Sequence, residues 1–126
     1  MNTAAVQSIA PEIPPYAMPV STLARMFGID ASEIEGYAEQ GMLPRLPFGM
    51  HDAFWLLALR RGLNATSQLP NPLKPHVVMG IGWLIGVDMT FDADDLAAGA
   101  GIFERNGLTH EEFLASIGAA ISFCGM

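Results

Sequence analysis

The fold is decided by residues 18–44, which read MPVSTLARMFGIDASEIEGYAEQGMLP. Ser21 or Thr22 is predicted to cap a short first helix, because a hydroxyl oxygen can accept the free amide hydrogens at a helix start. Leu23 begins an apolar face whose members recur at helical spacing. Gly28 is predicted to end this helix, since glycine readily adopts the left-handed conformation of a helix terminus.

A second helix is predicted after a turn of about three residues. Asp30 and Glu33 have the spacing of a capping box, in which two side chains satisfy amide hydrogens at the helix start. Ile34 and Ala38 would then pack against the first helix, and Gly41 would end the second. Two short helices joined by so sharp a corner are typical of a helix-turn-helix.

One more helix is expected beside this pair. Residues 45–49 are too short for a long hairpin and are interpreted as a small wing or a tight loop. The next helix is predicted from Met50 to Arg61, with Asp52 in its first turn and two arginines in its last, as the helix dipole favours. The sequence thus predicts a helix-turn-helix domain over residues 18–63.

The second half of the chain is predicted to be helical as well. A proline-rich linker at 64–76 precedes a C-terminal helical region at 77–126. Val77–Val87 is interpreted as a buried helix in which Gly82 and Gly86 admit a close neighbour, while a strand stays open as an alternative because short apolar runs are ambiguous. The predicted fold class is therefore all-α.

Two further helices have clear start signals. Asp92 is expected to cap a helix over residues 93–106. Thr109 and Glu112 form a second capping box, which opens a last helix through about residue 123. Residues 1–17 contain three prolines and form an N-terminal arm, which is either disordered or laid across a neighbouring subunit.

The composition favours association with other protein chains. Hydrophobic residues make up 51% of the 126 residues and charged residues only 15%, whereas an average soluble domain has roughly 25% charged residues. A domain of this size cannot bury so much apolar surface by itself. We therefore expect a homo-oligomer or a permanent protein partner.

The charge is acidic and uneven. The net charge is −7. Residues 1–64 hold four arginines against six acids, a balance of −2, and residues 65–126 hold two basic residues against seven acids, a balance of −5. A basic field is the usual mark of a nucleic-acid binder. The chain lacks such a field, and duplex DNA remains a possible partner.

Several functional classes are not expected. Cys124 is the single cysteine, which excludes an intramolecular disulfide. The start of the chain has no secretory signal, and the longest apolar run is about half a membrane span. His51, His76 and His110 lie in separate segments without a metal-ligand or catalytic spacing. We expect no enzyme activity, cofactor, metal, small-molecule substrate or membrane partner, and a cytoplasmic or virion location.

The chain resembles a known family over about 45 residues. The resemblance lies at Leu23-Ala24, Phe27-Gly28, Ile34, Glu39-Gln40-Gly41-Met42 and Pro44. At these positions it is similar to the winged helix-turn-helix of the MerR and excisionase group, and within that group to the N-terminal domain of phage small terminase subunits. The resemblance implies that the exposed face of the second helix enters the major groove of DNA.

Two sets of residues are candidates for binding. The residues with suitable chemistry for DNA are Ser21, Thr22, Arg25, Ser32, Gln40 and Arg45. The large side chains that are candidates for a protein interface are Phe54, Trp55, Trp83 and Phe113.

Two functional hypotheses remain open. One is a phage-type DNA-binding module, either a DNA packaging subunit or a small transcriptional regulator, whose oligomer supplies avidity. The other is a protein adaptor or virion assembly component that has the same scaffold and no longer binds DNA. The second is favoured by Glu33, Glu35 and Glu39, since carboxylates on the second helix repel phosphates.

Overall fold

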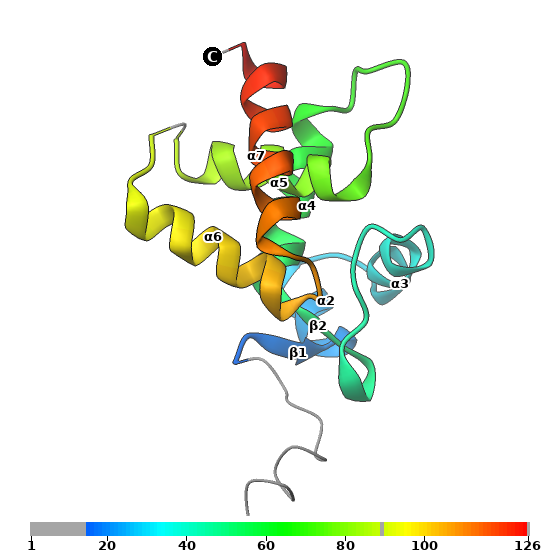
Figure 1. Cartoon of the computed structure of the whole chain (residues 1–126). Helices are drawn as coiled ribbons and strands as arrows, with labels where there is room; N and C mark the ends of the chain where they lie inside the picture. Colours follow the sequence, from blue (N-terminus) through cyan, green and yellow to red (C-terminus); the bar gives the residue numbers. More distant parts are fainter. Residues whose placement is uncertain (1–14, 89, 126) are drawn as a thin grey trace, which may run out of the picture.

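The computed structural model describes residues 15–88 and 90–125. Helices dominate it, with one small two-stranded sheet, so an all-α class is confirmed at this coarse level (Figure 1). The α-helices are α2 (Val20–Phe27), α3 (Ala31–Glu39), α4 (Ala53–Ala65), α5 (Pro75–Gly86), α6 (Ala93–Arg105) and α7 (His110–Cys124). The strands are β1 (Ala17–Pro19) and β2 (Met50–Asp52), and a 3-10 turn, η1, covers Pro47–Gly49.

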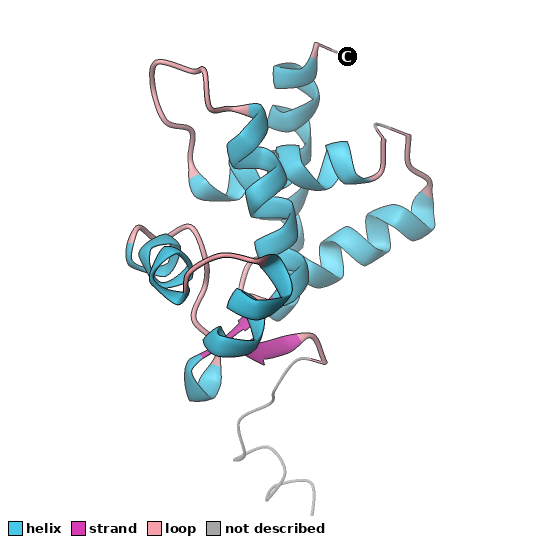
Figure 2. Ribbon diagram, turned by 180° about the vertical axis from the view of Figure 1, so that it is seen from behind, coloured by secondary structure: helices cyan, strands magenta, loops and turns pink. Residues whose placement is uncertain are grey.

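The sheet joins two segments on either side of the α2–α3 pair. β1 and β2 run antiparallel, with Ala17 opposite Asp52 and Pro19 opposite Met50 (Figure 2). The prediction that a helix begins at Met50 was wrong, because residues 50–52 are held extended by this pairing. Helix α4 begins three residues later, at Ala53, and it runs to Ala65, so its two arginines lie before its last turn.

The two short helices α2 and α3 form where they were predicted, but their starts differ in detail. α2 begins at Val20 after Pro19, with no side-chain cap, so the expected caps Ser21 and Thr22 lie within the helix. Asp30 occupies the predicted cap position of α3, but its carboxylate accepts no hydrogen bond there. The predicted capping box of α3 was therefore wrong. The predicted stops are confirmed, since Gly28 and Gly41 have φ angles of 66° and 77°.

Helices α4 and α5 pack against each other at glycines. A Cβ atom added to Gly82 would lie 1.6 Å from the carbonyl oxygen of Ala58, and one added to Gly62 would lie 1.9 Å from that of Val78. Only glycine leaves room for backbones to approach so closely. The prediction that Gly82 admits a close neighbour is thus confirmed, and the strand alternative for residues 77–87 is excluded.

The last two helices follow their start signals. Asp92 and Asp95 form a capping box at the start of α6, and Thr109 and Glu112 form one at the start of α7. α7 lies across α5 in Figure 1 and packs against it. Leu114 of α7 is 48% exposed. Phe113, Ile117 and Ala120 are the residues of that helix that are buried in the core.

One hydrophobic core runs through α2 to α7. The residues 66–74 connect α4 to α5, and these two helices pack directly on each other. The division into a domain, a linker and a C-terminal region stays a prediction. Most of the expected N-terminal arm, residues 1–14, lies outside the described residues. Among the helices of residues 15–88 and 90–125, none has both the length and the apolar character needed to span a membrane.

Candidate nucleic-acid interface

Helix α3 is attached to the protein by one face. Ile34 is fully buried and Ala38 is 8% exposed, and both belong to the core that includes Leu23 of α2. The opposite face is exposed, including Ser32 and Gln40. Figure 1 shows α3 at the side of the molecule, next to α2 and away from α6. The outer face of α3 is therefore open to a large partner.

A carboxylate, a phenol and a guanidinium join α3 to α4. The hydroxyl of Tyr37 donates to Glu33 Oε2 over 2.6 Å, and Arg60 Nη1 donates to the same oxygen over 2.7 Å. The Tyr37 hydrogen bond, helped by Arg60, lowers the pKa of Glu33 below its ordinary value. Burial, followed by the Glu33 hydrogen bond, raises the pKa of Tyr37. The charge of Glu33 is thus offset by Arg60 and is not a free negative charge on α3.

The segment that leaves α3 is fixed by hydrogen bonds from β2 and α4. The indole Nε1 of Trp55 donates to the carbonyl oxygen of Met42 over 2.9 Å. His51 Nδ1 lies 3.0 Å from the carbonyl oxygen of Pro44, so the bond requires the tautomer with a proton on Nδ1. Both side chains are almost fully buried. These two bonds set the position of the chain as it passes from α3 to the sheet.

The six predicted DNA-binding residues lie in the described part of the chain. Five are exposed and Thr22 is half-buried. Arg25 is in the last turn of α2 and Arg45 follows α3, so the two arginines flank α3 along the chain. Within residues 15–88 and 90–125, no carboxylate forms an ion pair with either of them. Glu35 and Glu39 are exposed on α3. Two negative charges therefore lie between these two arginines along the chain.

Sequence reasoning missed the structural role of Asp52. Its side chain is fully buried, and Oδ1 accepts hydrogen bonds from the amides of Phe54 and Trp55 over 2.9 and 3.2 Å. Oδ2 accepts from Arg105 Nε over 3.1 Å, and Asn106 Nδ2 lies 3.4 Å away. Asp52 therefore caps α4 and joins it to the end of α6. An aspartate directly before an apolar helical run is the signal that identifies such a cap.

Phe48 is the second feature that the sequence reasoning missed. It lies in the middle of the turn η1 with φ 63° and ψ 28°, a left-handed conformation that bulky residues rarely adopt. Such backbone strain costs of order 1–3 kcal/mol. The side chain is 72% exposed, more than any other large hydrophobic side chain of the described residues. Packing among the described residues therefore does not explain why a phenylalanine occupies this position.

Three of the four interface candidates are internal. Trp55, Trp83 and Phe113 are 2%, 6% and 0% exposed, and their rings contact one another through Phe103 in the core. Phe54 is different, because it is 40% exposed and its ring packs edge-on against Tyr16 with 4.3 Å between centroids. In this fold, only Phe54 of the four presents a large surface to a neighbouring chain.

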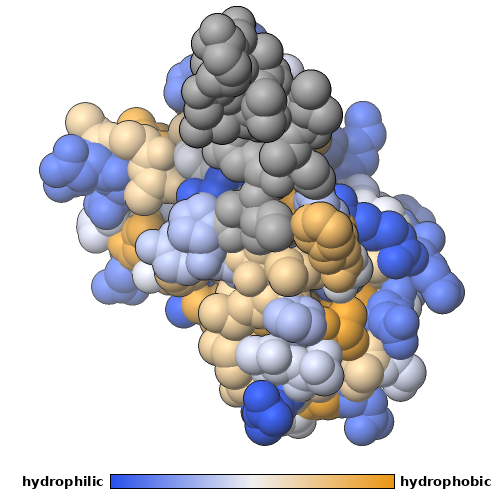
Figure 3. All heavy atoms as spheres, turned by 90° about the horizontal axis from the view of Figure 1, so that it is seen from below, coloured by the Kyte–Doolittle hydropathy of each residue, from blue (hydrophilic) through white to orange (hydrophobic). Residues whose placement is uncertain are grey.

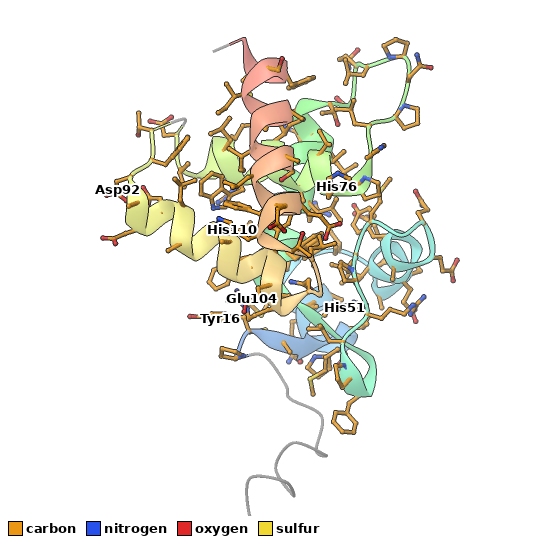
Figure 4. The ribbon with its side chains drawn as sticks, in the orientation of Figure 1. Tyr16, His51, His76, Asp92, Glu104 and His110 are labelled. Atoms are coloured by element: carbon orange, nitrogen blue, oxygen red, sulfur yellow. The ribbon has the colours of Figure 1, made fainter. Side chains whose placement is uncertain are left out.

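The histidines lie on different elements. Figure 4 shows His51 in strand β2, His76 at the start of α5 and His110 at the start of α7. Within the described residues, no group of three or more histidine, cysteine or acidic side chains is arranged to hold a metal ion. Nothing matches this chain among family models, curated proteins or solved structures.

Proposed function

We propose that this chain is a helix-turn-helix module that binds duplex DNA, with α3 as the helix that enters the major groove. The observation that carries the proposal is the way α3 is held. Its inner face is anchored by Ile34 and Ala38, while its outer face is exposed. An anchored helix with a free outer face is what insertion into a groove about 12 Å wide requires.

The distribution of charge supports this orientation. Arg25 and Arg45, which form no ion pair with a carboxylate of the described residues, flank α3 along the chain, and Arg60 offsets Glu33. Most of the acids of the second half lie on α6 and α7, and Figure 1 shows α6 on the side of the molecule away from α3. DNA that approaches α3 would therefore avoid the most acidic part of the protein. The two arginines would bind phosphates, while Ser32 and Gln40 supply groups that can hydrogen-bond to bases.

The proposal implies weak binding by a single protomer. Two phosphate contacts give a slope of about −1.8 in the logarithm of affinity against that of salt concentration. Binding would then weaken about tenfold between about 50 and about 200 mM salt. A homo-oligomer would raise the affinity through avidity. We propose that the assembled form acts as a phage DNA packaging subunit or a small transcriptional regulator, in the cytoplasm or the virion.

The test is a salt titration with fluorescently labelled duplex DNA. The full chain should increase the anisotropy of the labelled DNA at low salt, and Arg25→Ala and Arg45→Ala should each lower the slope by about 1. Lys74→Ala is the matched control, because Lys74 is an exposed cation in the loop between α4 and α5. Absence of binding at low salt, or equal losses in all three variants, would contradict the proposal.

The acids on α3 give an independent readout. Glu35→Gln and Glu39→Gln should strengthen nonspecific DNA binding, since each removes a charge that repels phosphates. Glu104→Gln on α6 is the control, because it removes an equally exposed charge far along the chain from α3. If the α3 variants behave like the control variant, then α3 does not face DNA.

A protein adaptor is the second candidate function. It is favoured by Met26, which lies in α2 next to Arg25 and is 58% exposed. Exposed methionine is common at surfaces that bind protein. An adaptor would leave the anisotropy of labelled DNA unchanged at every salt concentration, while Met26→Ala would weaken association with its protein partner.

A further inference from the structure

The turn η1 carries an apolar side chain that the described residues of its own chain leave uncovered. Phe48 is 72% exposed and lies at the centre of a three-residue turn that ends directly before β2. Figure 3, which views the molecule from below, shows apolar residues in the middle of the described part of this face and hydrophilic residues to either side of them. A phenyl ring displayed on a turn has the shape of a knob that inserts into a hollow.

A hollow of suitable size and chemistry lies elsewhere on the same chain. It has a volume of about 330 Å³ and is lined by Tyr16, Phe54, Ala98, Ile102 and Arg105. A cavity of about 150 Å³ already accommodates benzene, so a phenyl ring fits this one. Its walls include two aromatic rings, and the guanidinium of Arg105 lies 5.2 Å from the centroid of Tyr16. Such walls favour an aromatic guest.

The knob and the hollow lie at opposite ends of the small sheet. Phe48 precedes Met50, which pairs with Pro19, whereas Tyr16 and Phe54 flank the other end, where Ala17 pairs with Asp52. Phe48 does not line the hollow of its own chain. The knob and the hollow are different surfaces of one chain. Each protomer can therefore insert its knob into one neighbour and receive the knob of another.

We propose that Phe48 of one copy of this chain inserts into the Tyr16–Phe54 hollow of a second copy. The contact is heterologous, so repetition builds a closed ring or an open filament according to the rotation between neighbours. The partner is a second copy because the chain itself provides both halves of the contact. An anchor of one side chain buries less surface than a standard interface, so the assembly should dissociate on dilution.

The first test uses two variants that each break one half of the contact. Phe48→Ala removes the knob, and Ala98→Trp fills the hollow from α6. Because both positions are exposed, folding should be retained, and circular dichroism checks it. In light scattering without DNA, each variant should associate about tenfold or more weakly than the original chain, as expected for an aromatic anchor. Leu114→Ala, which truncates an exposed side chain on α7, should not change the mass.

Mixing the two variants gives the decisive result. The Ala98→Trp protein keeps its knob and the Phe48→Ala protein keeps its hollow, so the equimolar mixture should form a one-to-one dimer and nothing larger. The proposal is overturned if the original chain stays monomeric at high concentration, if either variant assembles like it, or if the mixture remains monomeric.

The same variants distinguish assembly from contact with DNA. If Phe48 were a wedge that enters the minor groove, Phe48→Ala would weaken DNA binding and leave the mass in the absence of DNA unchanged. That outcome would also overturn the proposal. The assembly is measured without DNA, so the proposed assembly can be contradicted while DNA binding by α3 is retained. Likewise, DNA binding by α3 can be contradicted while the assembly is retained.

Discussion

Helices α4 and α5 differ from the α2–α3 pair in what their glycines do. At Gly62 and Gly82, an added Cβ atom would lie within 2 Å of a carbonyl oxygen of the other helix. At Gly36, in the interior of α3, an added Cβ would meet nothing within 4 Å. Packing therefore dictates the residues of the α4–α5 contact, whereas the outer face of α3 is free of that constraint and can serve a partner.

The largest effect is expected for Gly82→Ala. The added methyl group would force α4 and α5 apart, because its nearest neighbour is the backbone of Ala58 and cannot rotate away. Overpacking of this kind costs about 3 kcal/mol of unfolding free energy, measured by urea denaturation. Gly118→Ala in α7 is the control, since an added Cβ there meets open space. An equal loss in both variants would remove the contrast between packed and open glycines.

A smaller effect is expected at the helix starts. Asp92 accepts a hydrogen bond from the amide of Asp95 over 2.9 Å, whereas the carboxylate of Asp30 caps nothing. Replacing an N-cap aspartate that makes this bond by alanine costs about 1 kcal/mol. Thermal unfolding should therefore show a clear loss for Asp92→Ala and a smaller one for Asp30→Ala. The reverse order would mean that α3 is capped and α6 is not.

Gly36→Ala should stabilise the protein. Glycine in a helix interior is about 0.5–1 kcal/mol less favourable than alanine, and the new methyl group has room. Urea denaturation should show a gain of that size. Loss of stability would instead show that α3 is packed at Gly36 as closely as α5 is at Gly82, and the two helix pairs would then not differ in this respect.

The smallest effect concerns pH. Because Tyr37 and Arg60 lower the pKa of Glu33 in the folded protein, Glu33 stabilises the fold at a pH above its ordinary pKa of 4.5. This contribution is lost as the pH falls below that value and the carboxylate takes up a proton. Glu33→Gln should thus be less stable than the original chain at pH 7 and equal to it in strong acid. Tyr37→Phe should reproduce part of this pattern.

The elements that sequence alone predicted well are those fixed by local bonds. The capping box of Thr109 and Glu112 lies within four residues, and so does that of Asp92. Gly28 and Gly41 end their helices where predicted, because a left-handed residue is a local requirement. The local pattern was sufficient for these features, whereas Asp30 and Glu33, which have the same spacing, form no capping box.

The elements that sequence did not predict depend on contacts between distant residues. Residues 50–52 are extended because they pair with β1, more than thirty residues earlier in the chain. Asp52 is buried because Arg105, 53 residues later, reaches it. The strained conformation of Phe48 is also invisible to periodicity, since a pattern of apolar residues does not reveal which of them stay exposed. The helix-turn-helix resemblance and its DNA-binding residues stay predictions.

The indole of Trp55 donates a hydrogen bond to the carbonyl oxygen of Met42. It is therefore a natural fluorophore at the segment that leaves α3. Trp83 lies on α5 between Phe91 and Phe113, so it reports on the C-terminal helices instead. Single-tryptophan versions of the chain would emit from two separate places. If the segment that leaves α3 loosens, the emission maximum of Trp55 should shift to longer wavelength while that of Trp83 stays unchanged. No attached dye is needed for this measurement.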